Sequence, residues 1–347
     1  MIRRFMLAAV LAGCLVWPSA AAAQSPADPV RAAASWLRTQ QQPDGGFSNG
    51  FVPGSDPGAT TDAVLAIAAT GEKPAEWIVG GHNPVDFLQQ AAASGSIAGA
   101  GGFAKITLAA IAAGADPRSF GGVDLIARIL DDFSNEAGLF GGGPFDTALA
   151  IQALAAAGEP VPETAVAGLL ATRMADGTYS FTGDITPGAG DSNTTAMAVL
   201  ALVAAGQRQE AAPSLEYFRS VQNDDGGWTY QKPSAFGEAT DANSTALVMQ
   251  ALAAAGEDLP AWNDPAQALL ALQVPSGAFI FNAATSSENL LATVQALPAL
   301  ALLVPGNAAA PAGTPWMAIG LAGLGVIMAA IAARRVLRKR AAEGHAE

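Results

Sequence analysis

An Ala/Leu-rich segment that recurs along the chain limits the possible folds more than any other feature. Two copies, DSNTTAMAVLALVAAG and DANSTALVMQALAAAG, occupy residues 191–206 and 241–256, 50 positions apart. Weaker copies occupy residues 61–71, 104–114, 145–158 and 288–300. Alanine and leucine favour helices, and the glycine that closes most copies is typical of a helix C-terminus. The pattern predicts six similar, almost wholly apolar helices.

A second, more amphipathic segment precedes each copy, for example VRAAASWLRTQQ, APSLEYFRSVQN and DPAQALLALQ. Most of these segments end in a turn with glycine and an aromatic residue, best kept at residues 41–47, 222–228 and 273–279. Residues 173–179 have Arg in place of Gln, and the copy around residues 87–95 is degenerate. An apolar helix that alternates with an amphipathic one suggests two concentric layers, and closure into a ring would remove exposed end faces. We therefore predict an all-α fold, an α/α toroid of six helix pairs over residues 24–304.

The spacing Gln-x-x-x-Gly-x-aromatic in these turns resembles the Gln-Trp repeat of the squalene cyclase and prenyltransferase superfamily, whose members fold as α/α toroids. The resemblance covers residues 28–304, nearly all of the chain between its two ends. It implies the fold but no single activity, because the same ring also occurs in prenyltransferase β-subunits, cobalamin transporters and complement-type thioester domains.

The activities that the resemblance implies can be compared with the residues present. Cyclases of this superfamily protonate an alkene with the central acid of Asp-x-Asp-Asp-Thr-Ala, but the nearest matches here carry Asn193 and Asn243 in that place. An amide cannot donate that proton. The predicted inner segments also offer few aromatic rings to stabilise a carbocation, unless turn aromatics reach inward. Those turn aromatics are Phe47, Trp228, Tyr230, Phe279 and Phe281.

Cysteine and histidine are too scarce for the zinc site of prenyltransferases or for a thioester. The chain has one cysteine, Cys14, and two histidines, His82 and His345. We therefore expect no cofactor and no metal. The cobalamin carriers combine the ring with a β-rich domain, and no alternating strand pattern follows residue 304.

The charge distribution argues against nucleic acid as a partner. Of the 17 basic residues, seven lie near the two ends, which leaves 10 basic and 28 acidic side chains in residues 24–313, a net charge of −18. Such a surface repels a polyanion.

The two ends have the pattern of targeting segments. Residues 1–23 combine two arginines, an apolar run and small residues, as a secretory signal peptide does. An alternative is a lipoprotein signal, because Leu-Ala-Gly-Cys14 resembles a lipobox. A Pro/Gly/Ala-rich linker at residues 305–315 precedes 18 uncharged residues, 316–333, and a basic tail, 334–347. This predicts a single transmembrane helix in the cell membrane, with residues 24–304 outside the cytoplasm and the tail inside.

Polar residues near the starts of the apolar segments are the possible site. We place Asp62, Asp146, Asp191 and Asp241 at equivalent positions, so that a closed ring would gather them around one opening. The full set of rim residues is Asp62, Lys105, Asp146, Asp191, Asn193, Thr194, Asp241, Asn243 and Ser244. One interpretation is helix capping, since Asp, Asn, Ser and Thr accept hydrogen bonds from first-turn N–H groups. The other is a polar rim that binds a ligand, with Lys105 available to an anion or simply exposed.

Three functions remain open from the sequence. The first is a membrane-anchored protein that binds a small, lipid-like or polymeric ligand in the ring centre. The second is a terpenoid cyclase or transferase with an unconventional acid, for which Asp191 and Asp241 are the first choices. The third is a cell-surface interaction scaffold whose centre is filled, because Ala-rich helices can pack closely.

Overall fold

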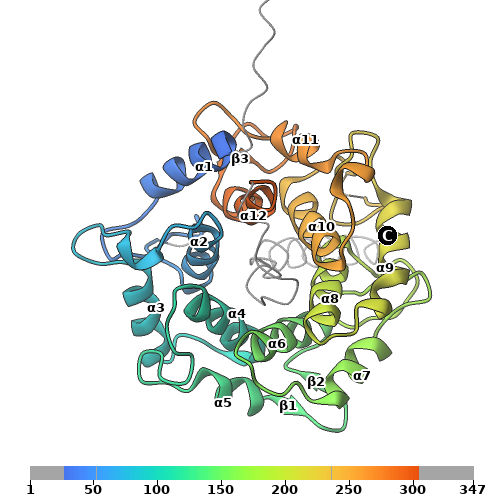
Figure 1. The fold of residues 1–347 in the computed structure, drawn as a ribbon, viewed down its shortest axis with the longest axis horizontal. Coiled ribbons are helices and arrows are strands. Elements are labelled where there is room, and N and C mark those ends of the chain that lie inside the picture. The colour runs from blue at the N-terminus through green and yellow to red at the C-terminus, as the bar shows by residue number, and fades with distance from the viewer. Residues whose placement is uncertain (1–26, 52, 236, 305–347) are drawn as a thin grey trace, which may run out of the picture.

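The described residues form a ring of helices in two layers (Figure 1). The computed structural model describes residues 27–51, 53–235 and 237–304. The inner layer consists of α2 (Pro57–Ala69), α4 (Gly99–Ala112), α6 (Pro144–Ala156), α8 (Ser192–Ala204), α10 (Ala242–Ala255) and α12 (Leu290–Ala301). The outer layer consists of α1 (Ala27–Thr39), α3 (Pro84–Ala93), α5 (Leu125–Leu130), α7 (Glu163–Ala171), α9 (Ala212–Val221) and α11 (Pro265–Leu270). The helical toroid predicted from the repeat is confirmed for this part of the chain.

Short elements connect the layers. In the described part of the chain, three 3-10 turns, η1 (Pro74–Glu76), η2 (Arg208–Ala211) and η3 (Leu259–Ala261), precede outer helices. Two antiparallel hairpins, β1 (Phe133–Ser134) with β2 (Leu139–Phe140) and β3 (Phe279–Ile280) with β4 (Glu288–Asn289), precede inner helices. The second hairpin leads directly into α12, and this connection helps to build the pocket described below.

The inner helices are buried because their sequences offer no polar face. Residues 192–202 of α8 and 242–252 of α10 are all buried. Five of the six helices end at a glycine with φ between 71° and 84°, at positions 71, 114, 158, 206 and 256. The left-handed conformation of these glycines ends the helix without a Cβ clash, as the sequence pattern predicted.

The predicted Gln-x-x-x-Gly-x-aromatic turns connect neighbouring outer elements. In the first turn, the Gln41 amide nitrogen donates to the Gly45 carbonyl at 3.0 Å and to the Trp77 carbonyl, just before α3, at 2.9 Å. Gln222 forms the same pair of bonds within its turn and to Trp262. Where the motif has Arg173, the guanidinium donates to the Glu210 carbonyl at 2.7 Å, so arginine preserves the connection between units.

The aromatic residue of each turn is held by a threonine of the following inner helix. The backbone N–H of Trp228, for example, donates to Thr245 Oγ1 at 3.0 Å. The same bond joins Phe47 to Thr60, Phe140 to Thr147, Tyr179 to Thr195 and Phe279 to Thr293, at 2.9 to 3.0 Å. Each threonine hydroxyl thus provides a hydrogen-bond acceptor for a buried backbone N–H that water cannot reach.

The ring closes between the last inner helix and the first two helices. α12 contacts both α2 and α1. The Gln273 amide nitrogen donates to the Pro29 carbonyl at 2.9 Å, which repeats across the closure the bond that links successive units elsewhere. At Gly277, with φ of 95°, an added Cβ would lie 2.3 Å from the Ala32 carbonyl oxygen of α1. The first and last units therefore fit together as closely as units that are consecutive in sequence.

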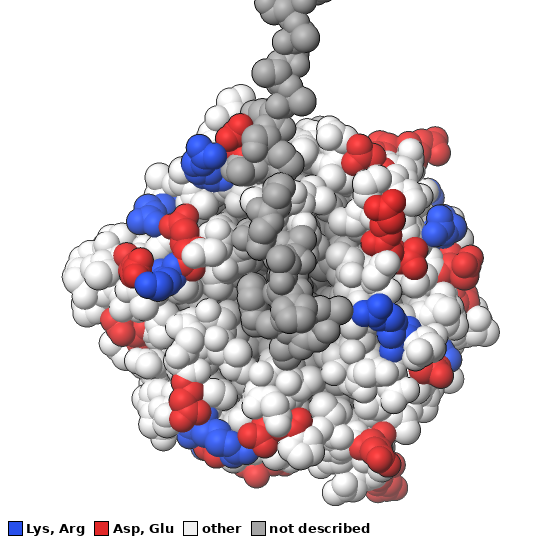
Figure 2. Space-filling view, in the orientation of Figure 1, with Lys and Arg blue, Asp and Glu red and all other residues white. Residues whose placement is uncertain are grey.

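Charged side chains lie around the periphery of the face shown in Figure 2. The predicted signal peptide, linker, transmembrane segment and basic tail lie outside the described residues. Within residues 27–304, no helix combines the length and the apolar character that a membrane crossing requires.

Candidate functional site

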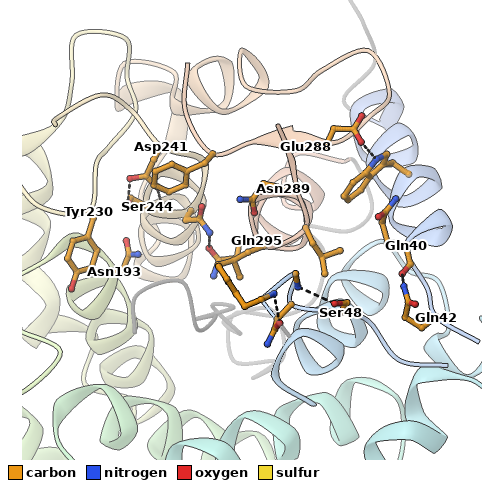
Figure 3. A pocket seen from close by; sticks show the side chains of 18 residues that line it. Gln40, Gln42, Ser48, Asn193, Tyr230, Asp241, Ser244, Glu288, Asn289 and Gln295 are labelled. Carbon is orange, nitrogen blue, oxygen red and sulfur yellow. Dashed lines mark hydrogen bonds between the residues drawn. The ribbon is translucent and has the colours of Figure 1, made fainter. Parts of the chain in front are cut away.

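A pocket of about 570 Å³ opens where three inner helices begin. Its walls come from the starts of α8, α10 and α12 and from the loop that follows α1. Figure 3 shows Asn193, Tyr230 and Asp241 on one side and Glu288, Gln40 and Gln42 on the other. The volume is within the range of about 300–1,000 Å³ that is common for small-molecule sites.

Asp191 and Asp241 are the N-caps of α8 and α10. Asp191 accepts the Thr194 N–H at 2.7 Å and the Thr194 hydroxyl at 2.8 Å. Asp241 accepts the same two groups of Ser244, at 2.7 and 2.9 Å. The capping interpretation of these two residues is therefore confirmed, and Asp241 and Ser244 also line the pocket.

Burial changes the acidity of both caps. Desolvation raises the pKa of Asp191 and of Asp241 to about 6, although first-turn hydrogen bonds act in the opposite direction. The side chain of Tyr230, which lines the pocket, contacts Asp191, and burial beside this carboxylate raises the pKa of the Tyr230 phenol. Both acids are thus mostly ionised at pH 7 but titrate within a mildly acidic range.

The predicted equivalence of the four aspartates is wrong for Asp62 and for Asp146, because the N-cap of α6 is Gly143. The residues of α2 and α12 that correspond to Asp191 are the N-caps Asp56 and Asn289. Asp62 lies in the interior of α2 and forms an ion pair of 2.7 Å with Lys105 of α4. Burial raises the pKa of Asp62, and the Lys105 charge acts in the opposite direction.

The prediction that Lys105 is exposed or available to an anion is also wrong. Its side chain is 12% exposed and is paired with Asp62, so the two residues neutralise each other between neighbouring inner helices. Neither residue lines the pocket.

Asp146 is likewise a packing residue. It lies in the first turn of α6, and its Oδ2 accepts the Gly142 N–H at 3.1 Å. An added Cβ at Gly101 of α4 would lie 2.1 Å from Asp146 Oδ1. Gly101 therefore leaves space for this carboxylate, and α4 begins five residues before the predicted segment.

Amide side chains from the inner helices form the deeper wall of the pocket. Asn193 is 4% exposed, and its Oδ1 has no hydrogen-bond partner among the described residues. Asn243 donates from its amide nitrogen to Gln295 Oε1. Asn289 caps α12 by accepting the Ala292 N–H at 2.9 Å. Asn193 and Asn243, which the sequence motif aligns with the central acid of cyclases, both provide polar groups to the pocket.

The rim comes from the loop after α1 and from the second hairpin. The indole N–H of Trp36 donates to Glu288 Oε2 at 2.9 Å across the ring closure. Hydrogen bonds from Ser276 and Trp36 lower the pKa of Glu288. Gln40, Gln42 and residues 48–51 complete this side. These residues were missed in the sequence because their positions depend on the closure.

Two of the five turn aromatics reach the pocket. The backbone carbonyls of Tyr230 and Phe281 accept the first N–H groups of α8 and α10, from Ser192 and Ala242, each at 2.8 Å. This bond holds each aromatic residue over the start of the preceding inner helix, and both side chains line the pocket. The other three turn aromatics, Phe47, Trp228 and Phe279, are fully buried in the ring.

The lining contains no Lys, Arg or His among its described residues. In residues 27–304, excluding 52 and 236, no three His, Cys, Asp or Glu side chains are grouped so that they could hold a metal. The chemical groups available to a ligand are amides, hydroxyls, two carboxylates and aromatic rings.

No established protein family and no curated protein matches this sequence. Solved structures do match its fold. A protein from Actinoplanes has a TM-score of 0.61 at 17% identity, over 80% of this chain and 98% of that one. The type II terpene cyclase MstE from Scytonema has a TM-score of 0.56 at 14% identity, over 81% and 98%. An unsaturated glucuronyl hydrolase specific for heparin has a TM-score of 0.55 at 12% identity, over 79% and 95%. These identities show the fold alone, a toroid of the terpenoid cyclase-like type, as the repeat predicted.

Proposed function

We propose that this protein binds a small or polymeric ligand in the pocket at the starts of α8, α10 and α12. The observation that carries the proposal is Asn193, a buried amide that lines the pocket and whose oxygen has no partner. Burying a polar group without a hydrogen bond costs about 1–3 kcal/mol. A ligand bound beside Asn193 would recover that cost when the amide turns its oxygen toward the pocket, because the oxygen itself is buried in this structure.

The fold neighbours do not select the ligand. One MstE structure holds geranylgeranyl dihydroxybenzoate as substrate, whereas the hydrolase acts on a saccharide. The selection therefore depends on the side chains of this chain's own pocket. The alternative of an interaction scaffold with a filled centre is less favoured, because the pocket is open at the ring mouth.

The proposed location is outside the cytoplasm, with the ring anchored to the cell membrane by residues 316–333. The basis is the sequence pattern at the two ends, namely the apolar and small-residue run of 1–23 and the uncharged run followed by basic residues.

A second possible function is acid–base catalysis. Asp241 and Glu288 line one pocket, and their environments shift the two pKa values in opposite directions. Such a pair can provide an acid and a base at the same pH. Against this role, Asp241 already accepts two hydrogen bonds as a helix cap.

Native mass spectrometry of the full-length protein purified from its own host tests both functions. A binding protein retains the same ligand in the wild type and in Asp241→Asn, since asparagine also caps helices. An enzyme that uses Asp241 as its acid retains substrate in the variant but product in the wild type. A ligand-free protein from the native source would contradict the proposed function.

A further inference from the structure

The amides of the pocket lie at two depths. Asn193, Asn243 and Gln295 come from the inner helices, Asn289 is the N-cap of α12, and Gln40 and Gln42 come from the loop after α1. Each amide offers both a donor and an acceptor, as each hydroxyl group of a ligand also does. A surface of this composition suits a ligand with many hydroxyl groups better than an alkyl chain, because hydroxyl groups can add hydrogen bonds to these amides and an alkyl chain cannot.

The charge of the lining argues against an anionic ligand. Asp241 and Glu288 are its two acidic residues, and no described lining residue is basic. Proteins bind phosphates and carboxylates mainly with Arg, Lys or helix N-termini. Here the starts of α8 and α10 are already occupied by the carboxylates of Asp191 and Asp241. A phosphate, a diphosphate or a uronic acid would therefore meet negative charge without compensation.

Aromatic rings frame the amides. Phe51 is 66% exposed and Phe281 is 38% exposed, and both line the pocket with Trp36 and Tyr230. Large apolar side chains exposed beside a cavity commonly mark a binding surface. The C–H face of a sugar ring is apolar and carries partial positive charge, so it stacks on the negative face of an aromatic ring.

We infer that the pocket binds a neutral saccharide, with sugar hydroxyls on the inner-helix amides and a sugar face against the rim aromatics. This inference rests on the proposed function and specifies the ligand class. A peptide fits less well, because peptide-binding sites usually offer a free strand edge, an apolar groove or a charged cluster. The pocket instead offers side-chain amides both at the inner helices and in the loop after α1.

Calorimetric titration of the full-length chain tests the inference. The protein is held in a polyoxyethylene detergent, since a detergent with a sugar head group would compete. The neutral probes are cellohexaose, maltohexaose and N-acetylchitohexaose. Hexagalacturonate, spermine and an alanine–glycine hexapeptide represent anionic, cationic and peptide ligands. We expect at least one neutral oligosaccharide to bind and hexagalacturonate not to bind.

Two variants locate the binding site. Asn193→Leu removes the unpaired amide and should weaken saccharide binding at least tenfold, the loss of about one hydrogen bond. Its melting temperature should stay equal or rise, because Asn193 Oδ1 has no partner within the described structure. Asn135→Leu is the matched control, since Asn135 is exposed in the β1–β2 hairpin and does not line the pocket. If Asn193→Leu does not fold, Phe281→Ala at the half-exposed rim provides a second test, with weaker saccharide binding expected.

The outcomes separate the inference from the proposed function. Binding only of hexagalacturonate, spermine or the hexapeptide, lost in Asn193→Leu, overturns the saccharide assignment and leaves the pocket as a binding site. Saccharide binding that survives both Asn193→Leu and Phe281→Ala also overturns the assignment. If no probe binds, the ligand that native mass spectrometry detects decides between the outcomes. A retained sugar supports the saccharide inference, and a retained compound of another class overturns it. A protein without any retained ligand overturns both the inference and the proposed function.

Discussion

At the scale of single residues, the N-caps of α8 and α10 combine a structural role with a chemical one. Their type and position predicted capping from the sequence. Their burial was not predictable, because it results from loops around Tyr230 and Phe281 that fold back over the helix starts. Asp241 thereby becomes a carboxyl group that lines the pocket, and burial makes both caps weaker acids than an exposed aspartate.

The first prediction concerns the pH dependence of stability at Asp241. A carboxyl whose folded pKa is raised from 3.8 to about 6 stabilises the fold below pH 3.8, and this contribution is lost as the pH rises through about 6. Asp241→Asn keeps a capping oxygen and removes the buried charge. At pH 7.5 we expect the variant to be more stable by about 1–3 kcal/mol, with a smaller change in stability between pH 4 and 7. Urea unfolding across this pH range measures both effects.

Asp184 is the control for that prediction. It is exposed, and hydrogen bonds from Thr186 lower its pKa. Asp184→Asn should therefore not stabilise the protein at pH 7.5. Equal effects of the two substitutions would show that the burial of Asp241 has no energetic consequence.

The Asp62–Lys105 pair gives a second prediction. Lys105→Met leaves Asp62 buried without its partner, which should cost about 3–5 kcal/mol. Adding Asp62→Leu should recover most of the lost unfolding free energy, because the double variant no longer buries an unpaired charge. A double variant as unstable as the single one, in the same unfolding assay, would refute a charge-pairing role. The sequence did not reveal this pair because its partners are 43 positions apart and meet only through the alignment of α2 with α4.

At the scale of elements, the repeat predicted which segments are inner helices, where they end and how the turns are built. The starts were less accurate, as in α4, whose first turn is rich in glycine and where Gly101 leaves space for Asp146 of the adjacent helix. The two pocket aromatics share a simple position, two residues after a fully buried turn aromatic, Trp228 or Phe279. That offset is visible in the sequence. The sequence does not show, however, that the backbone carbonyl of each aromatic residue binds the start of the preceding inner helix and so places its side chain at the pocket.

The bond between each turn and its inner helix gives a third prediction. Thr245→Val removes the acceptor of the Trp228 N–H at constant shape and should cost about 1–3 kcal/mol of unfolding free energy. Thr245→Ser keeps a hydroxyl and should cost clearly less. Chemical denaturation followed by tryptophan fluorescence compares them. A serine variant as unstable as the valine variant would mean that packing of the threonine methyl, and not the hydrogen bond, is important.

At the scale of the whole molecule, six repeats close a ring, and the pocket depends on that closure. Trp36 and Glu288 are 252 positions apart and form a direct hydrogen bond. The number and type of repeats predicted closure from the sequence. The polar composition of the pocket was predicted only in part, because lining residues such as Ser48 and Asn49 come from a loop that the repeat does not cover.

Closure gives a fourth prediction. Gly277→Ala adds a methyl group against Ala32 of α1, whereas Gly122→Ala, at a similar positive φ, meets open space. The control should lose about 1–2 kcal/mol from backbone strain. Gly277→Ala should lose about 2 kcal/mol more, because α1 must move. Thermal unfolding by circular dichroism measures the difference, and equal losses would mean that α1 adjusts freely.

The direction of α12 determines how the pocket opening is oriented relative to the C-terminal end of the ring. This helix starts at the pocket and runs for 12 residues, about 18 Å, so its C-terminal end lies on the side of the ring away from the pocket. An anchor attached after residue 304 would therefore hold the ring from the side opposite the pocket. If residues 316–333 cross the membrane as predicted, the opening would point away from the lipid surface, toward whatever lies above it.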